Sequence, residues 1–159
     1  MDLRIGFGFD THRLEEGRDL LLGGIRIPHF KGEAGHSDAD VLVHAVCDAL
    51  LGAAGLPDIG RQFPDTSPEF KGIDSRILLS RVLRLIREKN FAILNIDSTV
   101  VLQNPRLAPF IPEMIRSLSD ILEIEESRVS VKAKTGEKLG FIGREEGVSA
   151  YAVTLLNRI

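Results

Sequence analysis

The sequence contains little of what several large classes of protein depend on. It has a single cysteine, Cys47, so no disulfide can form within the chain, and the apolar residues around it predict a small core residue. No apolar run approaches the length of a membrane span, and the first residues lack the apolar core of a signal peptide. We therefore expect a cytoplasmic protein that has no membrane partner.

Aromatic residues and positive charge are also scarce. Tryptophan is absent, tyrosine occurs once, and the formal net charge is −3. Nucleic-acid binding needs a basic surface, and binding along a single strand also needs aromatic side chains on which bases stack. We therefore expect no nucleic-acid partner, and any phosphate must be bound locally by metal ions and selected donors.

Length and composition fit one globular domain. The chain has 159 residues, of which 43% are hydrophobic and 27% are charged, and it contains no internal repeat or low-complexity linker. A chain of this size and composition can bury a core of its own. We therefore expect a single domain over residues 1–159.

Hydrophobic patterning predicts both strands and helices in this domain. The expected strands are residues 3–9, 91–102, 129–134 and 148–156, where strand is favoured over helix for the last, and a Gly-Gly hairpin joins 20–22 to 25–27. The expected helices are residues 38–54, 75–89 and 109–122. The expected loops are residues 31–37, 56–72 and 135–147. This order predicts an α/β fold of the α+β type, a mixed β-sheet with helices on one face plus a small β-hairpin.

Asp10, His12 and His44 form a candidate metal site. Asp10 and His12 are two residues apart at the end of a predicted strand, so their side chains point the same way. His44 lies off the apolar face of its helix, in register with Asp40 and Asp48, and so faces a cleft or solvent. One carboxylate and two imidazoles suit a zinc ion with one position open for a ligand. The alternative is two exposed histidines and a turn aspartate.

The segment from His36 to Asp40 precedes the first predicted helix. Ser37 or Asp38 is expected to be the N-cap, and the free N–H groups at such a helix start can also bind an anion. Capping does not explain His36, which is therefore the stronger functional candidate.

Three further segments each allow a structural and a functional interpretation. Residues 58–60 and 63–66 are either turn-forming or hold a polyol or ribose through their carboxylates. Residues 132–138 are either a solvated loop or a phosphate site with Glu137 on a magnesium ion, although they contain no P-loop pattern. Phe141, expected to be exposed, and residues 144–146 suggest an interface patch, whereas a lone aromatic is more often part of the core.

Taken in order, these segments resemble one enzyme family along nearly the whole chain. The resemblance rests on residues 4–6 and 8–12, His36-Ser37-Asp38, residues 58–60, residues 63–66 and Glu137-Lys138-Leu139-Gly140-Phe141. The series is similar to the 2-C-methyl-D-erythritol 2,4-cyclodiphosphate synthase family. This implies a cyclising phosphorus–oxygen lyase of non-mevalonate isoprenoid synthesis that converts 4-diphosphocytidyl-2-C-methyl-D-erythritol 2-phosphate to the cyclic diphosphate and CMP. The residues alone leave two rivals open, a metal-dependent phosphohydrolase of a nucleotide diphosphate compound and a trimeric binding protein with structural zinc.

The resemblance also implies an assembly and its cofactors. It implies a homotrimer with active sites between subunits, and one Zn²⁺ per subunit held by Asp10, His12 and His44. It further implies a second divalent ion, Mg²⁺ or Mn²⁺, at Glu137. His36 and Thr135 match positions that stabilise the transition state. Phe9, Arg144 and Glu146 match the lining of a central cavity, which holds an isoprenoid diphosphate in some relatives.

The remaining implied residues contact the substrate. Residues 102–108 match the segment that receives the cytosine, largely through backbone groups. The expected substrate-binding residues are Asp10, Thr11, His12, His36, Ser37, Asp58, Ile59, Gly60, Phe63, Pro64, Asp65, Thr66, Ser67, Leu102, Gln103, Asn104, Pro105, Arg106, Leu107, Ala108, Lys134, Thr135, Gly136, Glu137, Phe141 and Arg144. Many relatives carry threonines where this chain has Lys134 and Gly136, but Thr135 is retained. Some relatives are fused to a cytidylyltransferase, for which we expect no room in 159 residues.

Overall fold

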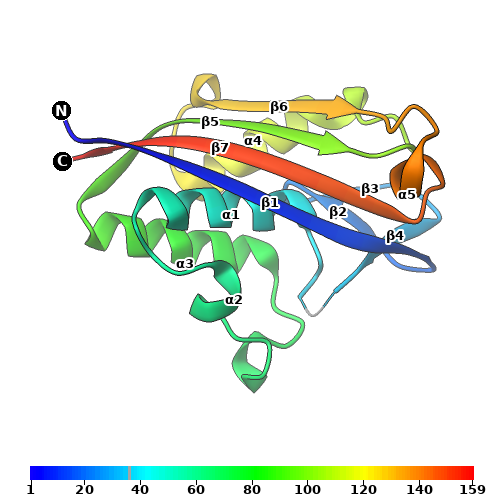
Figure 1. Cartoon of the computed structure of the whole chain (residues 1–159), viewed down its shortest axis with the longest axis horizontal. Helices are drawn as coiled ribbons and strands as arrows, with labels where there is room; N and C mark the ends of the chain where they lie inside the picture. The colour runs from blue at the N-terminus through cyan, green and yellow to red at the C-terminus, as the bar shows by residue number, and fades with distance from the viewer. Residues whose placement is uncertain (36) are drawn as a thin grey trace.

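A five-stranded mixed sheet runs along the length of the molecule (Figure 1). The computed structural model describes residues 1–35 and 37–159, and His36 lies outside the described residues. The strand order is β4-β1-β7-β5-β6. The strands are β1 (Leu3–Glu16), β4 (Lys31–Ala34), β5 (Phe91–Val101), β6 (Val129–Lys134) and β7 (Gly147–Arg158). Among the described strands only β5 and β6 pair in parallel, so the predicted mixed sheet is confirmed.

A two-stranded hairpin stands apart from the main sheet. It consists of β2 (Leu20–Leu22) and β3 (Ile25–Ile27), as the sequence predicted. Gly23 and Gly24 connect the strands with φ values of 64° and 79°. Two successive residues with positive φ form the turn that matches the twist of a two-residue hairpin, and glycine adopts this conformation without steric cost.

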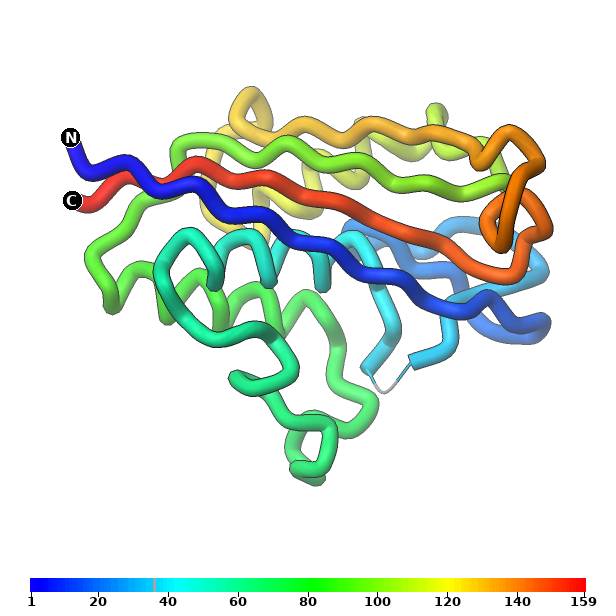
Figure 2. Tube along the Cα trace, in the orientation of Figure 1, coloured from blue at the N-terminus to red at the C-terminus, as the bar shows by residue number. Residues whose placement is uncertain are grey.

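The main helices lie on one face of the sheet, and their traces run alongside it in Figure 2. They are α1 (Val41–Ala53), α3 (Ser75–Glu88) and α4 (Ile111–Leu122). Shorter helical segments are α2 (Ile59–Gln62), η1 (Pro68–Phe70), η2 (Ala108–Phe110), η3 (Glu126–Arg128) and α5 (Gly140–Gly143). The predicted arrangement, a mixed sheet with helices on one face plus a small hairpin, is confirmed.

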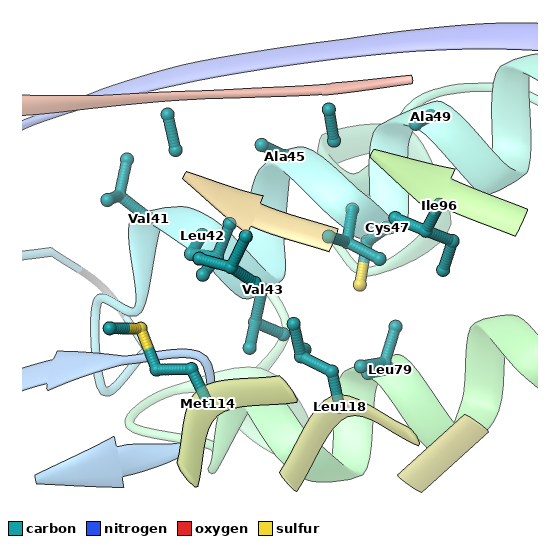
Figure 3. Packing of buried hydrophobic residues seen from close by; sticks show 14 of the residues in the cluster. Val41, Leu42, Val43, Ala45, Cys47, Ala49, Leu79, Ile96, Met114 and Leu118 are labelled. Atoms are coloured by element: carbon teal, nitrogen blue, oxygen red, sulfur yellow. The ribbon is translucent and has the colours of Figure 1, made fainter. Parts of the chain in front are cut away.

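The core lies around α1, which is apolar on nearly all sides and buried accordingly. Figure 3 shows Val43 and Cys47 of α1 among side chains of α3, α4 and β5, including Leu79, Leu118 and Ile96. Cys47 is a buried free cysteine, as predicted. Because α1 is enclosed by apolar neighbours, its few polar residues are confined to a single row.

The inner face of β1 is formed by small and polar residues. Gly6 and Gly8 face α1, whereas Ile5 and Phe7 face outward and are 75% and 62% exposed. A Cβ atom at Gly6 would lie 1.8 Å from the carbonyl oxygen of Ala49, so a side chain there cannot fit. The helix therefore packs directly on the strand backbone, and Ile5 and Phe7 are left on the outer face of the sheet.

Several predicted boundaries are wrong. Residues 31–34 form β4 rather than a loop, because β1 continues to Glu16 and pairs with them. The predicted loops 56–72 and 135–147 contain α2, η1 and α5. Helix α1 begins at Val41 rather than residue 38, because Ala39 adopts a φ of 62° that a right-handed helix cannot include.

Candidate metal centre and neighbouring cavities

Asp10, His12 and His44 come together as the sequence predicted. Asp10 and His12 both point from β1 toward α1, and His44 reaches them from α1. The Asp10 Oδ2 atom lies 2.9 Å from His12 Nε2 and 3.2 Å from His44 Nδ1. One ligand atom from each residue lies within 4.8 Å of the other two. Among the described residues, this is the one group of at least three histidine, cysteine or carboxylate side chains that could hold a metal ion.

The remaining ring nitrogens are held by protein oxygens. His12 Nδ1 lies 2.8 Å from the carbonyl oxygen of Ala39, and His44 Nε2 lies 3.0 Å from both Ser37 Oγ and Ser75 Oγ. Such partners fix the orientation and tautomer of a metal-binding histidine. The backbone oxygen of Ala39 can only accept a hydrogen bond, so His12 Nδ1 carries a proton and His12 Nε2, which faces Asp10, is the nitrogen that could bind a metal.

The electrostatics of the group favour a cation. Burial opposes ionisation of Asp10, but hydrogen bonds with His12 and His44 hold the pKa of this carboxyl well below its ordinary value. Burial likewise opposes protonation of His12, yet the neighbouring carboxyl groups of Asp10 and Glu33 raise the pKa of the imidazole to about 10. The site therefore stabilises a positive charge beside Asp10. Two imidazoles and one carboxylate fit a divalent ion such as zinc and leave a coordination position open.

A row of polar residues on α1 connects this centre to other segments. His44 lines a cavity, as predicted from its register with Asp40 and Asp48. The Asp48 Oδ1 atom accepts a hydrogen bond of 2.8 Å from the backbone N–H of Ile59, which places α2 beside the centre. Asp40, by contrast, is buried, and burial raises the pKa of its carboxyl to about 6.

Asp40 is the N-cap of α1, so the prediction of Ser37 or Asp38 as the cap is wrong. Its Oδ1 atom accepts hydrogen bonds of 3.0 Å from the backbone N–H groups of Val43 and Gly23. Ser37 Oγ instead accepts from the N–H of Ala39 within the preceding turn. Asp38 accepts from both the backbone N–H and the hydroxyl of Ser75, and so reaches His44 through that hydroxyl.

A cavity of about 400 Å³ opens beside His12 and His44. It is lined by His12, Ala34, Gly35, Ser37, His44, Ile59, Gly60, Phe63, Asp65, Phe70, Ile73 and Leu78. The structure thus brings the predicted segments 58–60 and 63–66 to the metal centre. Four expected substrate-binding residues from this described part of the chain do not line the cavity: Asp58, Pro64, Thr66 and Ser67. Asp58 is instead the N-cap of α2, where its carboxylate accepts from the backbone N–H of Arg61 at 2.9 Å.

A second cavity, of about 450 Å³, joins two other predicted segments. It is lined by Leu102, Gln103, Asn104, Pro105, Arg106, Leu107, Ala108, Ala133, Lys134, Thr135 and Glu137. Gln103 Oε1 accepts a hydrogen bond of 3.1 Å from the N–H of Lys138, which ties the two segments together. Glu137 lines this cavity and not the one at His12, so a single chain presents the two expected metal positions in separate cavities.

Phe141 and Glu146 lie near His12 on a third surface. Phe141 is 42% exposed and shares a cavity of about 300 Å³ with Thr11 and His12. The expectation that Phe141 is exposed is confirmed. Arg144 Nε donates to Glu146 Oε1 at 2.9 Å, and this exposed pair lowers the pKa of the Glu146 carboxyl.

The outer face of the sheet carries a contiguous apolar patch. This outer apolar face consists of Ile5, Phe7, Phe9, Tyr151 and Val153, and the rings of Phe9 and Tyr151 are 5.1 Å apart. Tyr151 and Val153 are paired with Phe9 and Phe7 across the β1–β7 ladder. Exposed apolar patches of this kind mark interaction surfaces.

Two residues of the site were missed by the sequence analysis. Ser75 bonds to His44, and Glu33 approaches His12, with Glu33 Oε1 lying 3.7 Å from His12 Nδ1. Burial raises the pKa of Glu33 to about 8. No local pattern marked either residue. Ser75 directly follows Asp74, the N-cap of α3, and Glu33 stood in a predicted loop.

Within the described part of the chain, every helix is too short or too polar to cross a membrane.

Fold and site together define a mixed α/β protein with a candidate divalent-metal centre between a strand and a helix. The family model described as the YgbB family matches residues 3–157, and the chain belongs to this family. A relative from Porphyromonas gingivalis, named 2-C-methyl-D-erythritol 2,4-cyclodiphosphate synthase, is 60% identical over 153 residues, which are 96% of this chain and 94% of the relative. The resemblance drawn from the sequence is confirmed.

Solved structures share the fold. A structure of 2C-methyl-D-erythritol-2,4-cyclodiphosphate synthase in a CDP-bound form is 41% identical with a TM-score of 0.90, covering 97% of this chain and 100% of that one. The bifunctional IspDF from Campylobacter jejuni is 44% identical with a TM-score of 0.95, covering 99% of this chain. This chain spans 43% of that bifunctional protein.

Proposed function

We propose that this protein converts 4-diphosphocytidyl-2-C-methyl-D-erythritol 2-phosphate to 2-C-methyl-D-erythritol 2,4-cyclodiphosphate and CMP, in non-mevalonate isoprenoid precursor synthesis. Relatives that cover nearly the whole chain carry the name of this synthase, and one solved relative binds CDP. The observation that carries the proposal is the Asp10–His12–His44 cluster, which opens on a cavity large enough for part of a substrate.

Asp10, His12 and His44 would hold one zinc ion per subunit, and Glu137 would hold a magnesium or manganese ion together with substrate phosphates. When bound, these ions act as Lewis acids that draw negative charge from phosphate oxygens. His12 and His44 present Nε2 and Nδ1 to that position because protein oxygens hold their other nitrogens. The closeness of Asp10, His12 and His44 supports the first of these two assignments.

In the proposed reaction the substrate's 2-phosphate oxygen attacks the β-phosphorus, and the bond from that phosphorus to the CMP oxygen breaks. The nucleophile is already an anion, so the site needs no strong general base. Thr135 and His36 are proposed to donate hydrogen bonds to the transferring phosphoryl group. Alignment of the two phosphates is worth roughly 7–11 kcal/mol. Ile59, Phe63 and Phe70 give the cavity an apolar wall that limits hydrolysis by water.

The cytidine portion is proposed to occupy the second cavity. Residues 102–108 present backbone groups along one side of it, and Lys134 and Thr135 lie on the other. Lys134, whose ammonium group can approach a phosphate, is proposed to add a contact where many relatives have a threonine. Asp58 and Gly60 are proposed to contact the polyol and ribose, and Phe141 and Arg144 the bound substrate.

The active form is proposed to be a cytoplasmic homotrimer with active sites between subunits. Two features support this assembly. The metal centre and the Glu137 cavity are separate on one chain, and a neighbouring subunit would bring one to the other. The outer apolar face would also be covered in a closed ring of sheets. Phe9, Arg144 and Glu146 would then line a central cavity that accepts an isoprenoid diphosphate.

Phosphorus-31 NMR of the reaction with magnesium tests the activity. We expect CMP and a cyclic diphosphate from the wild-type protein and from Asp19→Asn, a charge change at an exposed position, but not from Asp10→Asn. A linear diphosphate that incorporates solvent oxygen-18 would indicate a phosphohydrolase instead. Unfolding by a chelator, with no turnover under any metal condition, would indicate structural zinc.

A further inference from the structure

Glu33 is a buried carboxyl group behind the metal centre. Its side chain has no exposed surface, and its Oε1 atom lies 3.7 Å from His12 Nδ1, on the side of the ring away from Asp10. The same oxygen accepts a hydrogen bond of 3.0 Å from the backbone N–H of Val41. Glu33 Oε2 is also buried and has no hydrogen-bond partner among the described residues. Burying an unsatisfied carboxyl oxygen is costly, so its retention calls for a function.

The sheet register directs Glu33 toward His12. Glu33 of β4 is paired with Leu14 of β1, so the two side chains share one face of the sheet. His12 precedes Leu14 by two residues on the same strand and therefore points to that face as well. Because Val41 is the first residue of α1, the carboxyl of Glu33 connects β4 to the start of the helix that carries His44.

We propose that Glu33 is a positioning residue that orients His12 and strengthens its binding of the metal. The inference rests on the metal centre of the proposed function. The Nδ1 proton of His12 is donated to the carbonyl oxygen of Ala39 at 2.8 Å, and the Glu33 Oε1 atom lies 3.7 Å from the same nitrogen. A carboxyl group on the far side of an imidazole fixes the ring and makes its other nitrogen a better ligand. Through Val41, the same group sets the position of α1 relative to β1.

Three variants separate this role from a structural one. Glu33→Gln keeps the size of the side chain and an oxygen for the Val41 N–H, but removes the ionisable carboxyl group. Glu33→Leu removes every polar atom. Glu15→Gln makes the same substitution on the neighbouring strand, where Glu15 is exposed and paired with Arg18. Zinc affinity is measured by competition with a chromophoric chelator, and cobalt replaces zinc to report on ligand geometry through its visible absorption spectrum.

We expect zinc affinity to fall about 10–100-fold in Glu33→Leu and by a smaller factor in Glu33→Gln, with no change in Glu15→Gln. The cobalt spectrum should shift in both Glu33 variants. Thermal unfolding in the presence of EDTA reports on the fold alone, and if Glu33→Leu does not fold, Glu33→Gln decides the question.

Equal zinc affinities and identical cobalt spectra in wild type and Glu33→Gln would overturn the proposal, even if the variant were less stable in EDTA, because only a structural role would remain. That result would leave the metal centre intact. Failure of the wild-type protein to bind zinc or cobalt would instead remove the metal centre itself, so the two failures are distinguishable.

Discussion

Gly8 of β1 lies directly against the backbone of Ala45 in α1. A Cβ atom at Gly8 would be 1.8 Å from the Ala45 carbonyl oxygen, which no side chain tolerates. Gly8 belongs to an inward-facing series on β1 that continues through Asp10 and His12. The close approach that Gly8 allows is therefore the reason that His44, on the same helix as Ala45, reaches Asp10 and His12 on the strand.

Gly8→Ala is expected to destabilise the fold and weaken the metal centre together. Overpacking against a backbone costs about 1–3 kcal/mol and forces the helix away from the strand. Gly52→Ala is the matched control, because Gly52 lies within α1 with nothing within 4 Å of an added Cβ atom. That change should instead stabilise the helix by about 0.5–1 kcal/mol. Urea unfolding and zinc titration measure both effects, and a neutral Gly8→Ala would contradict the packing described.

His44→Ala is expected to abolish metal binding while the protein stays folded and keeps the proposed trimeric state. His44 borders a cavity and contacts Asp10, Ser37 and Ser75 through its ring nitrogens, so its loss leaves the apolar core intact. Metal content by mass spectrometry, circular dichroism and light scattering measure the three properties. His29→Ala removes a histidine outside the cluster and should keep its metal. Full metal occupancy in His44→Ala would refute the ligand assignment.

Metal affinity is expected to rise with pH. The pKa of His12 is raised from 6.5 to about 10, so near neutral pH a metal must displace a proton from this imidazole. Apparent zinc affinity should therefore increase about tenfold per pH unit between about pH 6 and pH 8. In the metal-free protein, the free energy of unfolding should instead decrease as pH rises. The contribution of protonated His12 is complete below pH 6.5, the ordinary pKa of histidine, and is lost as pH rises through the raised pKa of about 10. Chelator competition over this range tests the first statement, which a pH-independent affinity would disprove.

A charge on the outer apolar face is expected to break the proposed trimer. Phe7 is 62% exposed on one chain, and Phe7→Glu would bury an unpaired carboxylate if that face is covered by other subunits. Ile77→Glu is the control, since Ile77 is 49% exposed on α3, on the helical side of the sheet. We expect light scattering to give the mass of a monomer for Phe7→Glu and of a trimer for Ile77→Glu. A trimer in both variants would exclude this face as the interface.

The metal cluster and the hairpin could be predicted because short-range geometry determines them. Asp10 and His12 needed only the two-residue period of a strand, and the position of His44 followed from the helical repeat. Gly23 and Gly24 identified a hairpin by their conformational freedom alone. Each of these features depends on neighbours in the sequence, and each was found where the pattern placed it.

The cap of α1 and the environment of Glu33 could not be predicted, because distant residues decide them. Asp38 and Asp40 are both competent caps, and the choice between them depends on the positive φ of Ala39 and on two N–H groups of the hairpin. Glu33 belongs to a strand that exists only because β1 is long enough to pair with it. Its approach to His12 is a consequence of sheet register, which no local pattern encodes.

The pairing of the first strand with the last brings both chain ends to one end of the molecule (Figure 1). Arg158 donates its backbone N–H to the carbonyl oxygen of Asp2 at 3.0 Å, and its side chain bonds to the Asp2 carboxylate at 2.8 Å. From that end β1 runs toward Asp10 and His12, so additional polypeptide joined to either terminus would be held away from the chemistry. The fold is thus well suited to gene fusion, in keeping with its occurrence as 43% of a bifunctional Campylobacter jejuni chain.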